Sequence, residues 1–185
     1  MNFEEEAEAA PFSPEVEAGL SQIALDRAPG ELAKLAEADN EYQVFVHLSS
    51  AAAAAFHLER FVDAKQFAER ALALAPAFPA DWNYGNAIHM GHTVLGLLAL
   101  NAEDYTSAIN ELYESGKTPG SPQLNTFGPT MQLAKALLKL GHVEPVLSYL
   151  EQCRVFWEMG SIRIDLWERK IREGQVPNFF GRSHA

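Results

Sequence analysis

Apolar residues recur with helical spacing along most of this chain. In the segment 61–75 they fall three and four positions apart, which is the period of one helix face. The preceding segment, 41–58, contains the alanine run 51–55, which favours helix and leaves no bulk on any side. Because only Glu59 and Arg60 separate the two segments, we expect two antiparallel helices in close contact.

The N-terminal part predicts two shorter helices in front of this pair. Ser13-Pro14-Glu15 supplies an N-cap residue, a proline suited to the first turn and a carboxylate that complements the helix dipole. The apolar stripe that follows consists of Val16, Leu20, Ile23 and Ala24. Pro29-Gly30 is expected to end this helix, and a short second helix is expected to continue to Asp39-Asn40.

The segment 80–101 predicts a long helix at the centre of the fold. Its first half carries four polar residues that a packed helix does not require, namely Asn83, Asn86, His89 and His92. Gly85 and Gly91 lie in the same half, and each costs about 1 kcal/mol relative to alanine inside a helix. We therefore expect another backbone or a ligand to approach the helix closely at these two glycines.

Three stretches of the chain share one pattern of aromatic and small residues. The first has Ala51-Ala52, Phe61, Ala64, Ala71 and Pro76; the second has Leu95-Gly96, Tyr105 and Ala108; the third has Leu133-Ala134, Leu137, Gly141, Val146 and Cys153. In this order and spacing the residues resemble the tetratricopeptide repeat, a helix–turn–helix unit of about 34 residues. The resemblance implies an all-α fold, a right-handed solenoid of helical hairpins with about eight to nine helices and a C-terminal capping helix.

The chain departs from this repeat at two places. Counted from Phe45, His89 and Phe127, the three copies start 44 and 38 residues apart, which puts ten extra residues at 79–88 and four near Pro122. The ten would lengthen the second long helix by about 15 Å if they are helical. The loop 116–129, rich in proline and glycine, is expected to wedge against that helix.

The polar residues of the central helix admit three interpretations. They hydrogen-bond the following loop, they bind a ligand or a peptide, or His89 and His92 hold a metal ion. The metal interpretation is the weakest, because the nearest carboxylates, Asp81 and Glu103, lie turns away along the helix. The first two interpretations remain open at this point.

Composition and charge narrow the class of protein. The chain has 185 residues, 48% hydrophobic and 21% charged, which is typical of one globular domain. A net charge of −11 disfavours nucleic acid as a partner, and no apolar run is long enough for a membrane span. Residues 1–11 predict a disordered acidic tail with no secretory signal, residues 12–175 the helical domain, and residues 176–185 an extended tail. A single cysteine, Cys153, fits a cytoplasmic location.

The resemblance to the repeat family implies a function in binding. Members of the family commonly bind peptides in a concave groove, and carrying this over gives a mainly apolar groove that suits an amphipathic helix or an extended apolar segment. We expect a non-catalytic adaptor or scaffold without a cofactor. The residues expected to contact the partner are Ser49, Ala53, Phe56, Asn83, Asn86, His89, Met90, Thr93, Leu97, Asn101, Met131 and Lys135.

Three alternatives compete with this interpretation. The first is a small-ligand or enzymatic site around Asn86, His89 and His92, completed by a carboxylate from elsewhere. The second is a cytoplasmic chaperone of the kind that holds a secretion substrate, which the size and the acidic charge would suit. The third is self-association into a homo-oligomer, in which Phe179 and Phe180 of the tail enter the groove of a neighbouring copy.

Overall fold

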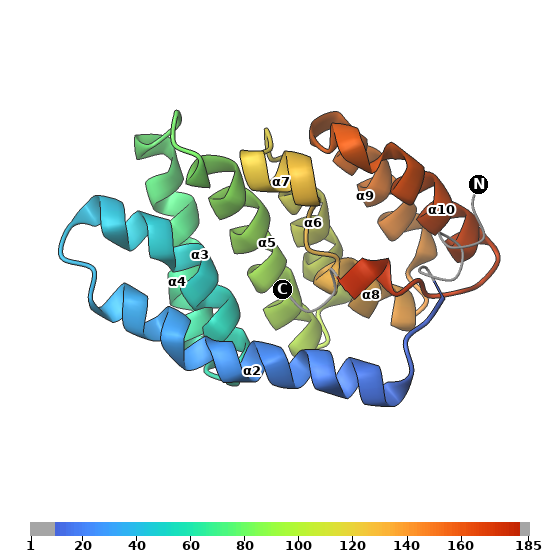
Figure 1. The fold of residues 1–185 in the computed structure, drawn as a ribbon, viewed down its shortest axis with the longest axis horizontal. Helices are drawn as coiled ribbons and strands as arrows, with labels where there is room; N and C mark the ends of the chain where they lie inside the picture. Colours follow the sequence, from blue (N-terminus) through green and yellow to red (C-terminus); the bar gives the residue numbers. More distant parts are fainter. Residues whose placement is uncertain (1–9, 182–185) are drawn as a thin grey trace.

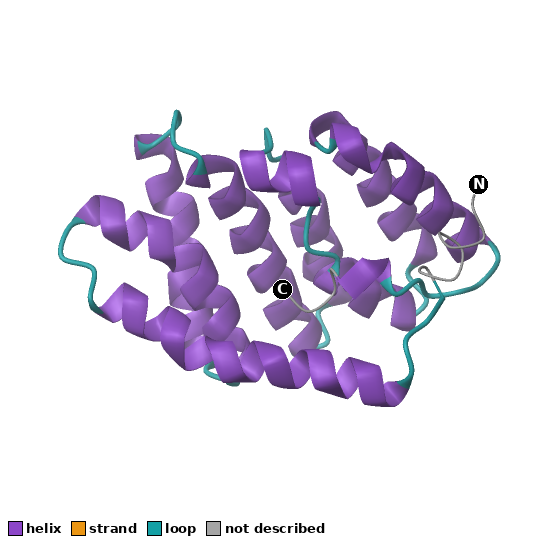
Figure 2. Ribbon diagram, viewed as in Figure 1, coloured by secondary structure: helices purple, strands orange, loops and turns teal. Residues whose placement is uncertain are grey.

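The computed structural model describes residues 10–181, and in this range every regular element is a helix (Figures 1 and 2). The α-helices are α2 (Pro14–Ala36), α3 (Glu41–His57), α4 (Phe61–Leu74), α5 (Asn83–Asn101), α6 (Tyr105–Ser115), α7 (Pro122–Phe127), α8 (Gln132–Lys139), α9 (Val143–Phe156) and α10 (Ser161–Arg172). Three short 3₁₀ turns are η1 (Ala75–Ala77), η2 (Glu158–Gly160) and η3 (Phe179–Gly181). The prediction of an all-α chain is confirmed. None of these helices is long and apolar enough to cross a membrane.

Three of the connections between helices share one geometry. The turns α3–α4, α5–α6 and α8–α9 each contain a residue with positive φ: Glu59 at 57°, Glu103 at 58° and Gly141 at 86°. In each turn the next N–H donates to a carbonyl five residues earlier: Arg60 to Ala55 at 2.8 Å, Asp104 to Ala99 at 2.9 Å and His142 to Leu137 at 3.0 Å. This closes the helix end with a left-handed residue and allows the chain to reverse in a few residues. The turns are 44 and 38 residues apart, the spacing of the three sequence patterns.

The alanines allow the helices to approach one another closely. Ala51, Ala52 and Ala55 have no exposed surface, and α3 packs against α2, α4 and α5 at once. Ala64 and Ala68 of α4 are equally buried. A larger side chain at these positions would force the helix axes apart, so the alanine run has the packing role predicted for it.

The first helix is longer than the sequence predicts. Pro29-Gly30 was expected to end it, but α2 continues through both residues to Ala36. Proline lacks an N–H and crowds the carbonyl four residues earlier, so it disfavours a helix interior. Here Leu32 and Leu35 pack against the two clusters formed around α3 and α4, and this packing holds the second half of α2 in line with the first. The prediction of two separate helices was wrong for this reason.

The largest part of the core lies between α5 and the C-terminal elements. It includes Leu112 of α6, Leu137 of α8, Leu150 of α9 and Trp167 of α10, all 1% exposed or less. Within α10, Trp167 has no exposed surface, whereas Ile162 is 63% exposed.

The last described residues belong to this core. Phe179 is fully buried and meets Trp167 edge-on, with 5.0 Å between ring centroids. Asn178 Nδ2 donates to the carbonyl of Ala10 at 2.7 Å, which brings the two ends of the described chain together. Residues 176–180 thus pack against this core, while residues 182–185 and the acidic segment 1–9 lie outside the described part.

The turn geometry predicts an unusual effect of glycine. Replacing Glu59 or Glu103 with glycine removes a Cβ from a left-handed backbone, so each variant should raise the free energy of unfolding by about 1 kcal/mol, measured by urea denaturation. The matched control is Glu69→Gly at an exposed position of α4, which should lower it by about 1 kcal/mol. Equal destabilisation by all three variants would contradict the role assigned to the turns.

Candidate functional site

Helix α5 and the loop that follows α6 are joined through polar contacts. Thr118 Oγ1 donates to the carbonyl of Gly85 at 2.8 Å, and Ser121 Oγ donates to Asn86 Oδ1 at 2.6 Å. Asn86 in turn donates to Gln123 Oε1 at 3.3 Å. The loop therefore lies along the first half of α5, as predicted.

The centre of these contacts is the imidazole of His89, which is 2% exposed. The N–H of Thr130 donates to Nε2 at 3.0 Å, so the proton of the neutral ring sits on Nδ1, which lies 3.3 Å from the carbonyl of Ser115. One side chain thus joins the start and the end of the loop region 115–130. Both ring nitrogens are used by backbone groups.

Burial keeps this ring neutral. Removal from water lowers the pKa of His89 from 6.5 to about 4, against the opposing effect of the Ser115 carbonyl and with a smaller contribution from His92. Protonation at Nε2 would also place two donors face to face, because Thr130 N–H points at that atom. The contacts around His89 favour the interpretation that the polar residues bind the following loop.

The two unexplained glycines of α5 mark close approaches. A Cβ on Gly85 would lie 1.8 Å from the carbonyl oxygen of Gly120, and a Cβ on Gly91 would lie 2.8 Å from Leu72 Cγ. At Gly85 the neighbour is the loop backbone, and at Gly91 it is a side chain of α4. The expectation of close approach is confirmed at both positions.

The remaining polar residues of α5 have separate partners. His92 Nδ1 lies 2.7 Å from Glu111 Oε2 of α6. Asn83 donates through its backbone and its amide to Asp81 Oδ1, at 2.8 and 2.9 Å, so α5 begins at Asn83 and the extension is shorter than the predicted start at residue 80. Among residues 10–181 no three His, Cys, Asp or Glu side chains form a group that could hold a metal ion.

A second region of interest lies where α2 crosses the other helices. In Figure 1, α2 (blue) runs below α3 and α5 toward the C-terminal half of the molecule. There Glu17 forms an ion pair with Lys135 of α8, whose side chain is only 7% exposed. The ammonium also lies 5.8 Å from the centre of the Phe12 ring. Burial lowers the pKa of Lys135, while the hydrogen bond and the charge of Glu17 raise it.

Two cavities accompany α2 along this crossing. One, of about 340 Å³, is lined by Ile23, Ala24, Arg27, Ala28 and Glu31 of α2 together with Ser50, Ala53, Ala54, His57 and Met90. The other, of about 420 Å³, is lined by Pro11, Phe12, Pro14 and Glu17 together with Lys135, Lys139 and Val176. We call the surface made by Ala53, Met90 and Lys135 the docking face. Helix α2 lies over this docking face and leaves the two cavities beside it unfilled.

The structure separates the twelve residues predicted to contact a partner into groups. Ala53, Met90 and Lys135 line the docking face, whereas Asn83, Asn86 and His89 have the polar contacts described above. The buried members away from α2 are Thr93, whose hydroxyl donates to the His89 carbonyl, and the core residues Leu97 and Met131. Ser49 and Phe56 are half-buried on α3, and Asn101 is exposed at the end of α5.

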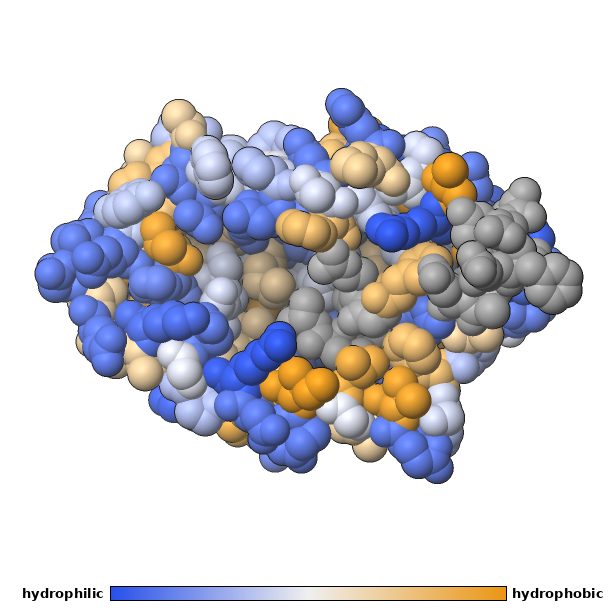
Figure 3. Space-filling view, in the orientation of Figure 1, coloured by the Kyte–Doolittle hydropathy of each residue, from blue (hydrophilic) through white to orange (hydrophobic). Residues whose placement is uncertain are grey.

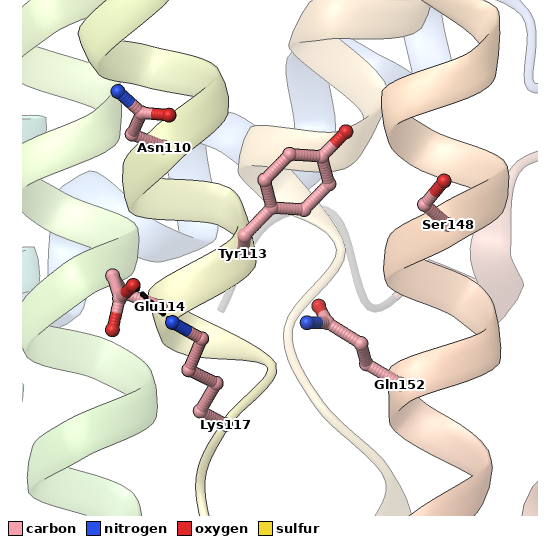
Figure 4. A pocket seen from close by; sticks show the side chains of 6 residues that line it. All are labelled: Asn110, Tyr113, Glu114, Lys117, Ser148 and Gln152. Atoms are coloured by element: carbon pink, nitrogen blue, oxygen red, sulfur yellow. Dashed lines mark hydrogen bonds and ion pairs between the residues drawn. The ribbon is translucent and has the colours of Figure 1, made fainter.

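A polar pocket of about 550 Å³ opens between α6 and α9 (Figure 4). Tyr113 points from α6 toward α9, and Gln152 points back toward α6. Glu114 and Lys117 form an ion pair on the α6 side. This pocket was not predicted, because its polar lining residues lie on α6, just after α6 and on α9, and no sequence pattern relates these segments.

The part of α2 that meets the docking face was not predicted. Glu17, Arg27 and Glu31 line the cavities with the smaller residues Ala24 and Ala28. They are spaced at three, four and seven positions, so helical periodicity places them on one side. Val16 and Ile23 of the predicted apolar stripe are instead 45% and 47% exposed.

Alanine substitution of the two glycines should separate backbone contact from side-chain contact. Gly85→Ala should lower the free energy of unfolding by about 3 kcal/mol, since the loop backbone cannot move aside cheaply. Gly91→Ala should cost about 1 kcal/mol, because Leu72 can change its rotamer. Urea denaturation measures both, and equal costs would contradict the assignment of the 116–121 loop contact.

The neutral imidazole predicts an acid dependence of stability. The unfolded chain takes up a proton at His89 near pH 6.5 and the folded chain only near 4, so the free energy of unfolding should fall by about 3 kcal/mol between these values. His89→Gln should reduce this fall. Urea denaturation between pH 6.5 and pH 4 measures the free energy of unfolding of both proteins. If the wild type and His89→Gln lose stability in parallel over this range, the assignment is refuted.

Comparison of the chain with family models, curated proteins and solved structures found no match.

Proposed function

We propose that the protein is a non-catalytic binding module that holds a helical segment of another protein on its docking face. The observation that carries the proposal is the manner in which α2 lies on this face. A helix already fits there, with an ion pair between Glu17 and Lys135 and with open space beside Ala53 and Met90. A surface that accepts a helix and still leaves cavities suits recognition of a helix in a groove.

The recurring turns support a repeat-like arrangement for this module. The same left-handed turn occurs at Glu59, Glu103 and Gly141, with the spacing of the sequence patterns that resemble the tetratricopeptide repeat. Stacked helical hairpins of that kind present one extended surface to a partner. We therefore also propose that the helical hairpins stack into a right-handed solenoid.

The polar residues of α5 give less support to an enzymatic site. His89 is buried with both ring nitrogens directed at backbone groups, and His92 is directed at Glu111. A general base needs a ring nitrogen within reach of a substrate. Self-association through the tail is also less favoured, because Phe179 is buried within its own chain.

A photo-cross-linking residue at position 90 of the full chain tests the proposal. In extracts of the native cell it should cross-link a protein segment whose apolar residues have helical spacing, identified by mass spectrometry. The control position is Val155 on α9, which is 83% exposed and lies away from the docking face. The same segment at both positions, or none at position 90, would contradict the proposal.

Binding of the identified segment to the purified protein then tests whether the segment uses the docking face. A synthetic peptide of that segment should bind the wild type and bind Ala53→Glu at least about tenfold more weakly, because a carboxylate would enter the apolar part of the face. Val155→Glu should bind as the wild type does. Equal binding to all three proteins would show that the docking face is not used.

A further inference from the structure

The two halves of α2 differ in how firmly they are held. The second half contributes Leu32 and Leu35 to the packing around α3 and α4. In the first half, residues 14–28, only Ala28 is buried, and none of these residues belongs to or packs against a core cluster. We call residues 14–28 the strap.

The strap leaves apolar surface exposed at Val16 and at Ile23, and Ile23 also borders the cavity beside Ala53 and Met90. Val16 is 45% exposed and Ile23 is 47% exposed. Figure 3 shows apolar side chains gathered along the lower edge of the molecule, where Figure 1 places α2. These two side chains gain little burial where the strap lies, so the strap loses little apolar contact when it leaves the face.

Pro29 and Gly30 separate the strap from the anchored half. Pro29 has no N–H to donate to the carbonyl of Leu25, so one bond of the helix is missing at this point. Gly30 has open space around its Cα and adds conformational freedom. The strap can therefore separate here while Leu32 and Leu35 stay in place.

We propose that the strap is an internal occupant of the docking face, which is displaced when an amphipathic helix of a partner binds there with a carboxylate in the position of Glu17. This inference rests on the function proposed above and adds the chemistry of the partner and its regulation. The strap lowers the affinity of the face for external helices, because a partner has to replace it.

The contacts of the strap define what the partner has to supply. Lys135 is 5% exposed and forms its ion pair with Glu17, so a carboxylate on the partner would preserve the charge partner of a buried ammonium. Ala24 and Ala28 face the cavity beside Ala53 and Met90. A partner with larger apolar side chains at these two positions would fill that cavity and gain contact area over the strap.

A labelled peptide with the sequence of residues 12–31 serves as the probe. It carries Glu17, and it is titrated into the full-length wild type and the full-length Glu17→Gln variant, with fluorescence anisotropy as the measurement. The substitution weakens the strap and leaves the docking face intact, so the peptide should bind the variant about tenfold more tightly than the wild type.

Glu15→Gln is the matched control. It removes a carboxylate from the same helix turn, and Glu15 is exposed and interacts with Ser13 and not with the docking face. Its affinity for the peptide should equal that of the wild type. The double variant Glu17→Gln/Lys135→Gln should lose the gain, because the buried ammonium that pairs with the carboxylate at position 17 is then absent.

Two further measurements identify where the peptide sits. Hydrogen exchange of residues 14–28 should accelerate in Glu17→Gln when the peptide binds, while α3 stays protected. Light scattering should show a monomer throughout; a dimer of Glu17→Gln that the peptide dissociates would show that the strap of a second copy fills the face, and would overturn the inference.

Failure of the inference is distinct from failure of the proposed function. If the peptide binds Glu17→Gln no better than Glu15→Gln, the strap is not an occupant of the site and this inference falls. A partner helix cross-linked at position 90 would still support the proposed function in that case.

Discussion

The arrangement of the C-terminal half depends on one buried side chain. His89 holds the carbonyl of Ser115 on one ring nitrogen and the N–H of Thr130 on the other, so it fixes both ends of the loop between α6 and α8. Helix α8 begins two residues after Thr130 and carries Lys135. The position of the Lys135 ammonium on the docking face therefore depends on the hydrogen bonds that His89 of α5 makes with the loop.

A neutral histidine suits this role. The ring has one donor and one acceptor held at a fixed separation, which matches one carbonyl and one N–H. The same low-dielectric surroundings that strengthen these two hydrogen bonds exclude the charged form. The loop is consequently positioned by geometry that changes only when the ring takes up a proton.

The sequence predicted the elements whose signal is local. The hairpin of α3 and α4 followed from the alanine run and the two-residue turn, and the close approaches at Gly85 and Gly91 followed from the cost of glycine in a helix. The end of the first helix could not be predicted, because Pro29 is a local signal and Leu32 and Leu35 outweigh it through packing. The ion pair of Glu17 with Lys135 joins residues 118 apart in sequence, and no spacing rule relates them.

That long-range ion pair also bears on the order in which the chain folds. Most helix contacts join neighbours in the sequence, such as α3 with α4 and α5 with α6, and short loops close quickly. Closing a loop of this length in the unfolded chain carries an entropy cost that neighbouring hairpins do not have. Once α3 to α8 are packed, the two ends already lie near one another and most of that cost is gone. We therefore expect the ion pair between Glu17 and Lys135 to form after the rest of the chain has folded. The same ion pair should break first when the chain is heated.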